Sequence, residues 1–122
     1  MLAFIRAQMK SFGHAVRGIR LLVQSERNAQ IHLLASAVVI VLGLTFSISP
    51  EEWGLLVLAT GLVWAAEAVN TAVERVIDLC NPEHHPIAGE AKDLAAGAVL
   101  LAAVAALVVG LILFLPRIGT LL

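Results

Sequence analysis

The chain has 122 residues and a formal net charge of −1; 60% of its residues are apolar and only 14% are charged. This is too much apolar sequence for a soluble domain of this size, whose core is small, so a soluble globular fold is excluded. The near-zero net charge points to neither nucleic acid nor an acidic partner. The lone Cys80 excludes an intrachain disulfide.

Residues 4–28 are predicted to form an amphipathic helix at a membrane surface. The apolar residues recur at steps of three and four, the pattern of one helical face, and they are Ile5, Met9, Phe12, Val16, Ile19 and Val23. The basic residues lie mostly off this stripe, and they are Arg6, Lys10, Arg17 and Arg20. A basic helix with an apolar stripe lies in the membrane surface and favours anionic lipid. A soluble helix that packs on a partner is the alternative.

Three transmembrane helices are predicted, at residues 30–48, 53–79 and 92–115. Residues 94–115 carry no charge, and at about 1.5 Å per residue they extend about 33 Å, which is enough to cross a bilayer. The fold class is therefore an all-α membrane protein: an N-terminal amphipathic surface helix followed by three transmembrane helices, in one domain that spans residues 1–122.

Helix boundaries are marked by proline and by small polar residues. Ser49 followed by Pro50 is typical of a helix start. Asn81-Pro82 is expected to end the second transmembrane helix. Residues 83–89 are expected to form a polar loop that leads into the third one.

The basic residues predict the orientation of the chain. Most of them precede the first span or lie between the second and third, whereas the connection after the first span carries Glu51 and Glu52. The positive-inside rule therefore places the N-terminus and the second connection in the cytoplasm. The third span is rich in alanine and glycine, which lets helices in lipid approach closely. Three short spans could hardly enclose an ionisable cluster alone, so a homo-oligomer is expected.

The second span carries a stripe of polar residues. At 100° per residue these side chains fall within an arc of roughly 100°, and they are Glu67, Asn70, Thr71, Glu74 and Asp78. Glu67 lies about 21 Å along the helix from its start, close to the inner headgroup boundary, and Glu74 about 10 Å further, in the aqueous interface. Ionisable residues inside a span are costly and are candidates for a functional site.

The different depths of Glu67 and Glu74 in the membrane suit a reaction between a lipid hydroxyl and a water-soluble nucleotide. Glu67 could accept the hydroxyl proton as a base, Glu74 could hold Mg²⁺ through its carboxylate oxygens, and Asn70 would orient one or the other. Lys92 and Asp93 start the third span at the same membrane level, where a lysine can bind a phosphate in transfer. No phosphate-binding loop of the Walker type and no Rossmann fingerprint occurs in the sequence.

Other interpretations of the same residues remain open at this point. The acids on the second span could form interhelical contacts only, Glu67 could exchange protons in a small oligomeric exporter, or the chain could be a membrane scaffold. His14 and His32 are interpreted as interfacial side chains, and His84-His85 as loop residues that contact nucleotide or are solvated. Taken alone, the residues predict an oligomeric membrane protein with an acidic metal or proton site.

The pattern of acids and amides resembles a known family of membrane enzymes. The residues that carry the resemblance are Glu67-Ala-Val-Asn70-Thr71-Ala-Val-Glu74, then Asp78, then Ala91-Lys92-Asp93 with Ala96-Gly97-Ala98-Val99. They resemble the small bacterial diacylglycerol kinase family, which includes undecaprenol kinases, and the similarity covers nearly the whole chain. It implies an ATP- and Mg²⁺-dependent lipid kinase of the bacterial cytoplasmic membrane, in which each active site of a homotrimer is shared between neighbouring subunits.

The resemblance also implies roles for particular residues. The implied catalytic residues are Glu67, Asn70, Lys92 and Asp93, and the implied metal ligands are Glu26 and Glu74. The residues implied in ATP binding are Lys10, His14, Arg17, Glu26, Glu74, Glu83, His84, His85, Lys92 and Asp93. The residues implied in lipid binding are Gly13, Arg20, Ser25 and Glu67, with the surface helix as a lid over lipid and nucleotide.

Two branches of the family differ in their lipid substrate. The stretch His84-His85-Pro86-Ile87-Ala88 and the alanine-rich start of the third span are similar to the undecaprenol kinase branch. The predicted reaction is therefore the phosphorylation of undecaprenol, with diacylglycerol as the alternative acceptor. The family often has a basic residue near position 7, where this chain has Ala7, so Arg6 or Lys10 would have to take over any role in nucleotide binding.

Overall fold

The computed structural model describes residues 1–81 and 83–121, and α-helix is the regular secondary structure within them. The four helices are α1 (Leu2–Ser25), α2 (Arg27–Thr45), α3 (Pro50–Cys80) and α4 (Pro86–Gly119). Three of them, α2, α3 and α4, are long and apolar enough to cross a membrane. The predicted all-helical membrane protein is confirmed at this level.

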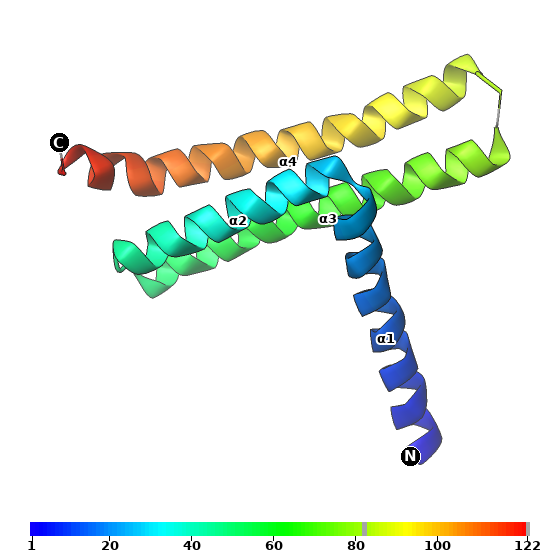
Figure 1. Ribbon diagram of the computed structural model, residues 1–122, viewed down its shortest axis with the longest axis horizontal. Helices are drawn as coiled ribbons and strands as arrows, with labels where there is room; N and C mark the ends of the chain where they lie inside the picture. The colour runs from blue at the N-terminus through cyan, green and yellow to red at the C-terminus, as the bar shows by residue number, and fades with distance from the viewer. Residues whose placement is uncertain (82, 122) are drawn as a thin grey trace.

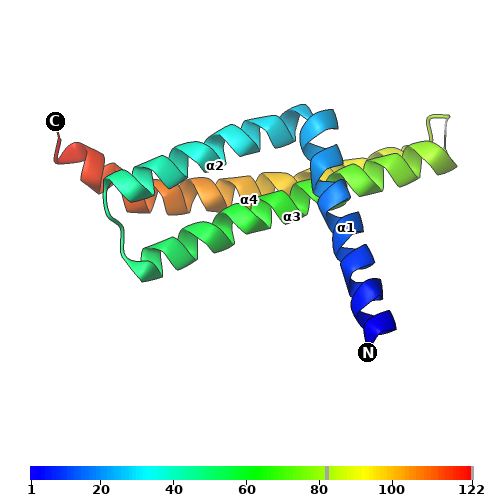
Figure 2. The ribbon, with the colours of Figure 1, turned by 60° about the horizontal axis from the view of Figure 1, so that its bottom comes forward.

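The three apolar helices run together, and α1 projects away from them (Figure 1). The backbones of α3 and α4 approach each other most extensively, and those of α2 and α3 approach less. Side chains near the end of α2 also pack against Leu113 and Phe114 of α4. The connection between α2 and α3 lies at the same end as the C-terminal part of α4, and the connection between α3 and α4 lies at the opposite end (Figure 2). The corner between α1 and α2 is found part-way along α3 in both views.

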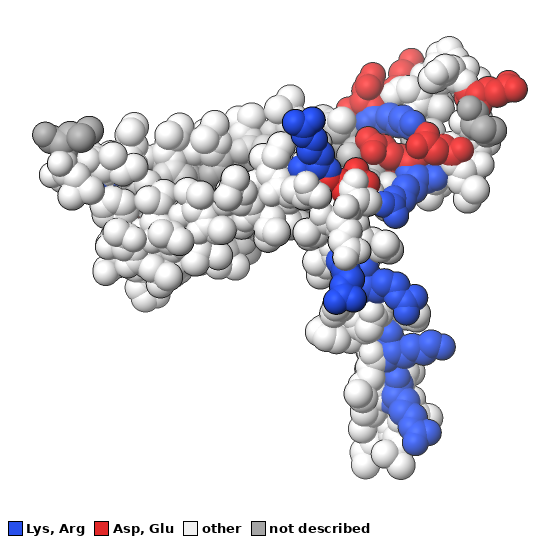
Figure 3. Space-filling model, in the orientation of Figure 1, with Lys and Arg blue, Asp and Glu red and all other residues white. Residues whose placement is uncertain are grey.

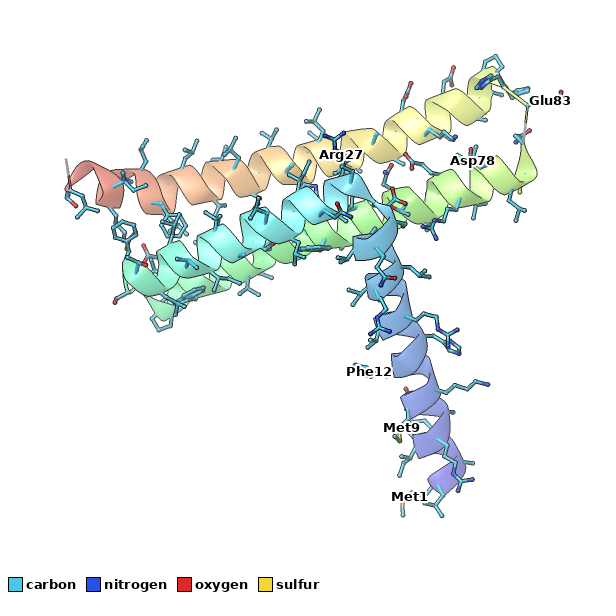
Figure 4. All side chains as sticks on the ribbon, viewed as in Figure 1. Met1, Met9, Phe12, Arg27, Asp78 and Glu83 are labelled. Carbon is cyan, nitrogen blue, oxygen red and sulfur yellow. The ribbon has the colours of Figure 1, made fainter. Side chains whose placement is uncertain are left out.

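The two sides of α1 differ in character. Lys and Arg side chains follow one side of this helix (Figure 3). Met9 and Phe12 extend from the other side, in the direction in which α2 and the uncharged part of the bundle run (Figure 4). Both are largely exposed, at 71% and 73%. The helix therefore leaves an apolar side that no other described part of the chain covers.

Helix α3 begins where Ser49 and Pro50 predict a helix start. The Ser49 hydroxyl accepts a hydrogen bond from the Glu52 amide at 3.2 Å, and the Glu52 carboxylate accepts one from the Ser49 amide at 2.8 Å. This is a capping box, with Pro50 in the first turn where its missing N–H costs nothing. The helix therefore begins before the predicted span of residues 53–79.

The N-terminal helix is shorter at its C-terminal end than predicted. It ends at Ser25 rather than at residue 28, because Glu26 is extended with φ −109° and ψ 120°. Arg75 of α3 stabilises this corner, since its guanidinium donates to the Ser25 hydroxyl at 2.7 Å and to the Glu26 carboxylate at 3.4 Å. The next helix begins at once at Arg27, ahead of the predicted residue 30.

The expected loop at residues 83–89 is wrong in its second half. Helix α4 already begins at Pro86, because the His85 imidazole accepts a hydrogen bond from the Ile87 amide at 3.2 Å and so caps the first turn. At the preceding boundary, α3 ends at Cys80 and Asn81 is its C-cap. The other residue of the predicted stop signal, Pro82, lies outside the described residues.

A small core closes the end of the bundle that holds the α2–α3 connection. Its buried members are Ile48, Leu56, Leu113 and Phe114. Beside this core the Arg117 guanidinium donates to both oxygens of the Glu52 carboxylate at 2.8 Å, which joins the start of α3 to the end of α4. This end is therefore fixed by packing and by an ion pair in which one guanidinium nitrogen contacts both carboxylate oxygens.

The packing of α2 against Trp53 can be tested by a substitution at Gly43. A Cβ atom at this position would lie 2.6 and 2.8 Å from ring atoms of Trp53, so the indole would have to move. We expect Gly43→Ala to lower the free energy of unfolding in mixed micelles by about 1–3 kcal/mol, the usual cost of overpacking. Gly61→Ala is the matched control, because open space surrounds Gly61 and alanine is the better helix former. Equal stability of the two variants would contradict this packing.

Candidate active site

Most charged side chains are gathered at one end of the molecule, and Glu51, Glu52 and Arg117 lie at the other. On the face shown in Figure 3, Asp, Glu, Lys and Arg cover α1 and the part of α3 and α4 near their connection, and the rest of the bundle is uncharged. Arg27 lies at the border, whereas Asp78 and Glu83 lie toward the far end (Figure 4). The border between the uncharged and charged parts is thus at the level of the α1–α2 corner.

Glu67 lies close to this border and is almost completely buried. It is 2% exposed, and its Oε2 atom has no hydrogen-bond partner among the described residues. Asn70 and Thr71, each 7% exposed, also have a buried side-chain oxygen without a partner. Helical spacing of three and four residues brings these side chains to one side of α3. Buried polar atoms normally have partners, so unpartnered oxygens on one side of a helix point to a binding site.

Two further carboxylates lie near Glu67. Glu74, on the next turn of α3, accepts a hydrogen bond from the Asn70 amide at 3.4 Å. Glu26 reaches the same region from the α1–α2 corner, where Arg75 holds it. Both carboxylates interact electrostatically with Glu67. The structure therefore brings Glu26, Glu67, Asn70 and Glu74, which the sequence singled out, into one neighbourhood.

The carboxylates fit a magnesium ion that is bound together with phosphate. Among the described residues, no group of three His, Cys, Asp or Glu side chains could hold a metal ion by itself. Magnesium bound to nucleotides usually takes one or two protein carboxylates and completes its octahedron with phosphate oxygens and waters. Glu26 and Glu74 offer oxygen ligands of this kind.

Lys92 approaches the same part of α3 from α4. Its ammonium group forms an ion pair with Asp78, one helical turn beyond Glu74. The side chain is only partly exposed, and the partner carboxylate is open to solvent. Asp93, the next residue, is exposed. A cation is thus held beside the acidic residues of α3.

Other residues singled out in the sequence lie elsewhere in this chain. Those on α1 are exposed along a helix that projects away from the bundle, and they are Lys10, Gly13, His14, Arg17 and Arg20. Those in the connection between α3 and α4 are also exposed, and they are Glu83, His84 and His85. Ser25 lies at the α1–α2 corner and donates to the Glu26 carboxylate at 3.0 Å. The structure does not bring the α1 residues to the Glu67 neighbourhood of the same chain.

Two residues in this neighbourhood were not assigned to a site from the sequence. Arg75 holds Ser25 and Glu26, and its partners lie 50 and 49 residues away in the chain, so helical periodicity could not reveal them. His32 was interpreted as an interfacial side chain, but its Nε2 atom lies 3.9 Å from Glu67 Oε2. The only sign of this contact in the sequence was that an ionisable side chain lies near the start of an apolar helix.

An apolar cavity adjoins this neighbourhood. It has a volume of about 390 Å³ and is lined by α2, α3 and α4. Nearly all of its lining is apolar, and the polar exceptions are His32, Ser36, Thr60 and Trp64. His32 therefore borders both the cavity and the buried carboxylate of Glu67. Such an arrangement can bring an apolar molecule with one polar end to a carboxylate.

Comparison with known proteins agrees with this chemistry. The model of the family described as prokaryotic diacylglycerol kinase matches residues 13–114. An undecaprenol kinase of Bacillus subtilis is 44% identical over 108 residues, which is 88% of each chain. A diacylglycerol kinase of Synechocystis is 40% identical over 107 residues, or 87% of this chain and 61% of that protein. A diacylglycerol kinase of Escherichia coli is 28% identical over 111 residues, 91% of each chain.

The family match spans α2, α3, most of α4 and the residues from Glu26 to Asp93 that form the candidate site. The identity to the first of these relatives extends over most of both chains. The chain belongs to the prokaryotic diacylglycerol kinase family, and it is a lipid kinase.

Proposed function

We propose that this lipid kinase transfers the γ-phosphoryl group of ATP to the hydroxyl of undecaprenol, with Glu67 as the general base. The observation that carries the proposal is the nearly complete burial of Glu67 with an unpartnered Oε2 atom, between an apolar cavity and two further carboxylates. A lipid alcohol would reach the base from the apolar side, and the nucleotide would reach it from the charged side.

The proposed orientation follows from the charges. The charged end of α3 and α4 and the basic side of α1 would lie in the cytoplasm, and the connection between α2 and α3 would face the other side of the bacterial cytoplasmic membrane. Helix α1 would then lie in the membrane surface, with Met9 and Phe12 in the acyl boundary and its lysine and arginine side chains in the headgroups. All 122 residues would form one membrane-embedded domain.

In the proposed reaction, the Glu67 carboxylate takes the proton of the lipid hydroxyl. The lipid oxygen then forms a bond to the γ-phosphorus, the bond from that phosphorus to the β–γ bridging oxygen breaks, and ADP leaves with the electron pair. Asn70 would orient Glu74 through the hydrogen bond that joins them. Lys92 and Asp93 would contact the transferring phosphate and the nucleotide.

Glu26 and Glu74 would bind Mg²⁺ together with the nucleotide phosphates. When bound, the ion neutralises charge on the β- and γ-phosphates. Arg75 keeps Glu26 beside α3, so the two carboxylates stay available to the same ion. The loop residues Glu83, His84 and His85 would contact the nucleotide from the connection between α3 and α4.

The exposed α1 residues fit a homotrimer in which sites are shared. Most of helix α1 projects away from its own bundle, which suits contact with a site on another copy. In the proposed trimer Lys10, His14 and Arg17 would contact the nucleotide of a neighbouring subunit, and Gly13 and Arg20 would contact its lipid. Ser25, beside Glu26 at the corner, would contact the lipid at the site of its own chain. The alanine and glycine residues of α4 would let helices of different subunits pack closely.

The relatives of the chain support the proposed lipid acceptor. The undecaprenol kinase is 44% identical and matches over most of both chains, which favours a polyprenol. The Synechocystis diacylglycerol kinase is 40% identical, so diacylglycerol is the second candidate. Purified protein in mixed micelles with labelled ATP should phosphorylate undecaprenol faster than diacylglycerol or ceramide. Faster transfer to diacylglycerol would replace the proposed acceptor, and transfer to none of them would contradict the proposed reaction.

The role of Glu67 can be tested by removing its charge at constant size. We expect Glu67→Gln to lower kcat about 10²- to 10⁴-fold, the usual contribution of a general base, while equilibrium binding of ATP is retained. Glu90→Gln is the matched control, since Glu90 is an exposed glutamate of α4, and its kcat should equal that of the wild type. Full activity of Glu67→Gln would remove the assigned base.

Glu74 is expected to act on the nucleotide side of the site. We predict that Glu74→Gln weakens the binding of Mg²⁺–ATP about tenfold, a loss of about 1.4 kcal/mol, because one carboxylate ligand becomes a neutral amide. Calorimetric titration of the micellar protein measures this affinity without turnover. Glu90→Gln again serves as control, and unchanged affinity in Glu74→Gln would show that the metal is bound elsewhere.

A further inference from the structure

His32 lies where its imidazole can hold the buried carboxylate in place. It belongs to the second turn of α2 and is 20% exposed, and its Nε2 atom is 3.9 Å from Glu67 Oε2. That oxygen is buried and has no hydrogen-bond partner. Leaving a buried carboxylate oxygen unpaired costs free energy, and a small rotation of either side chain would close the gap to a hydrogen bond.

Neighbouring contacts fix the turn of α2 that carries His32. The Trp64 indole of α3 donates to the Ser36 hydroxyl at 3.1 Å, and this hydroxyl donates to the His32 carbonyl at 2.7 Å. Trp64 lies three residues before Glu67, on the same side of α3. The contact between Trp64 and Ser36 therefore fixes how far along the α3 axis His32 lies, and this brings His32 to the level of Glu67.

We propose that His32 is a positioning residue for Glu67, an inference that rests on the proposed function. The Nε2–H group donates a hydrogen bond to Oε2 and fixes the carboxylate, so that Oε1 is left to take the proton of the lipid hydroxyl. Hydrogen bonds of catalytic groups are often long before substrate binds and tighten in the complex, which accounts for the distance of 3.9 Å.

The position of His32 also predicts which kinetic step depends on it. The imidazole lines the apolar cavity between α2, α3 and α4, so it lies on the lipid side of Glu67. Glu74 and Glu26 lie at the charged end instead. Loss of His32 should therefore slow phosphoryl transfer to the lipid and leave the binding of ATP unchanged.

Kinetics of two His32 variants test this role. We expect His32→Ala to lower kcat about 10- to 100-fold, less than removal of the base itself, with the KM for ATP within about twofold of wild type. His32→Gln keeps an N–H donor and should recover part of the loss. Thr45→Ala is the matched control, because Thr45 is an exposed residue of the same helix outside the cavity lining, and its kcat should stay near the wild-type value. A wild-type kcat in His32→Ala, or an equal loss in Thr45→Ala, would overturn the proposal.

A spectroscopic measurement tests the contact without turnover. The chain has four histidines, so imidazole ¹⁵N resonances of the micellar protein can be assigned by comparison with His32→Gln. We expect Glu67→Gln to shift the Nε2 resonance of His32 and to leave those of His84 and His85 in place. An unmoved His32 resonance would overturn the proposal. If the wild-type protein phosphorylates no lipid while His32 responds to Glu67→Gln, the proposed function fails and the contact stands.

Discussion

Burial of one carboxylate within an apolar bundle is the constraint on which this structure depends. An acidic side chain in the interior of a membrane costs about 3 kcal/mol, yet Glu67 is 2% exposed on a helix that is long and apolar enough to span. Other polar side chains lie near it: Asn70 and Thr71 on the same side of α3, His32 on α2 and Glu26 at the corner. In the proposed function, this costly group is kept for its chemistry.

In the proposed function, the arrangement of the helices lets a lipid and a nucleotide reach this carboxylate from two different media. The long packing of α3 against α4 carries the acidic residues from the uncharged part of the bundle into its charged end. The break at Glu26 lets the chain leave the bundle at the level where the charged part begins. A kinase for a lipid alcohol needs such a boundary, because one of its substrates is apolar and the other is highly charged.

Local signals in the sequence predicted much of the fold. The capping residues at Ser49 and Glu52 marked the start of α3, and helical spacing placed Glu67, Asn70 and Glu74 on one side of it. The start of α4 was missed because His85 was interpreted as a loop residue, although a histidine before proline can cap a first turn. Spacing within one helix is a local property, so it is visible without tertiary contacts.

The contacts between helices could not be predicted in the same way. Arg75 lies 50 residues from Ser25 and 49 residues from Glu26 in the sequence, yet it holds both. His32 faces Glu67 only because α2 runs back along α3 after the corner. Such pairs depend on how the helices pack, whereas the periodicity of a sequence shows only which residues share a side of one helix. The proposed roles of the α1 residues depend, in addition, on the proposed arrangement of subunits.

Glu26 is the one non-helical residue between α1 and α2, and this has a mechanical consequence. A spanning helix tilts when the hydrocarbon layer becomes thinner or thicker, whereas a helix that rests among the headgroups keeps its depth. The angle between α1 and α2 would then change at the backbone of Glu26, and this change would move the Glu26 carboxylate. Phosphoryl transfer would thus become sensitive to the thickness of the host bilayer, through a hinge that is one residue long.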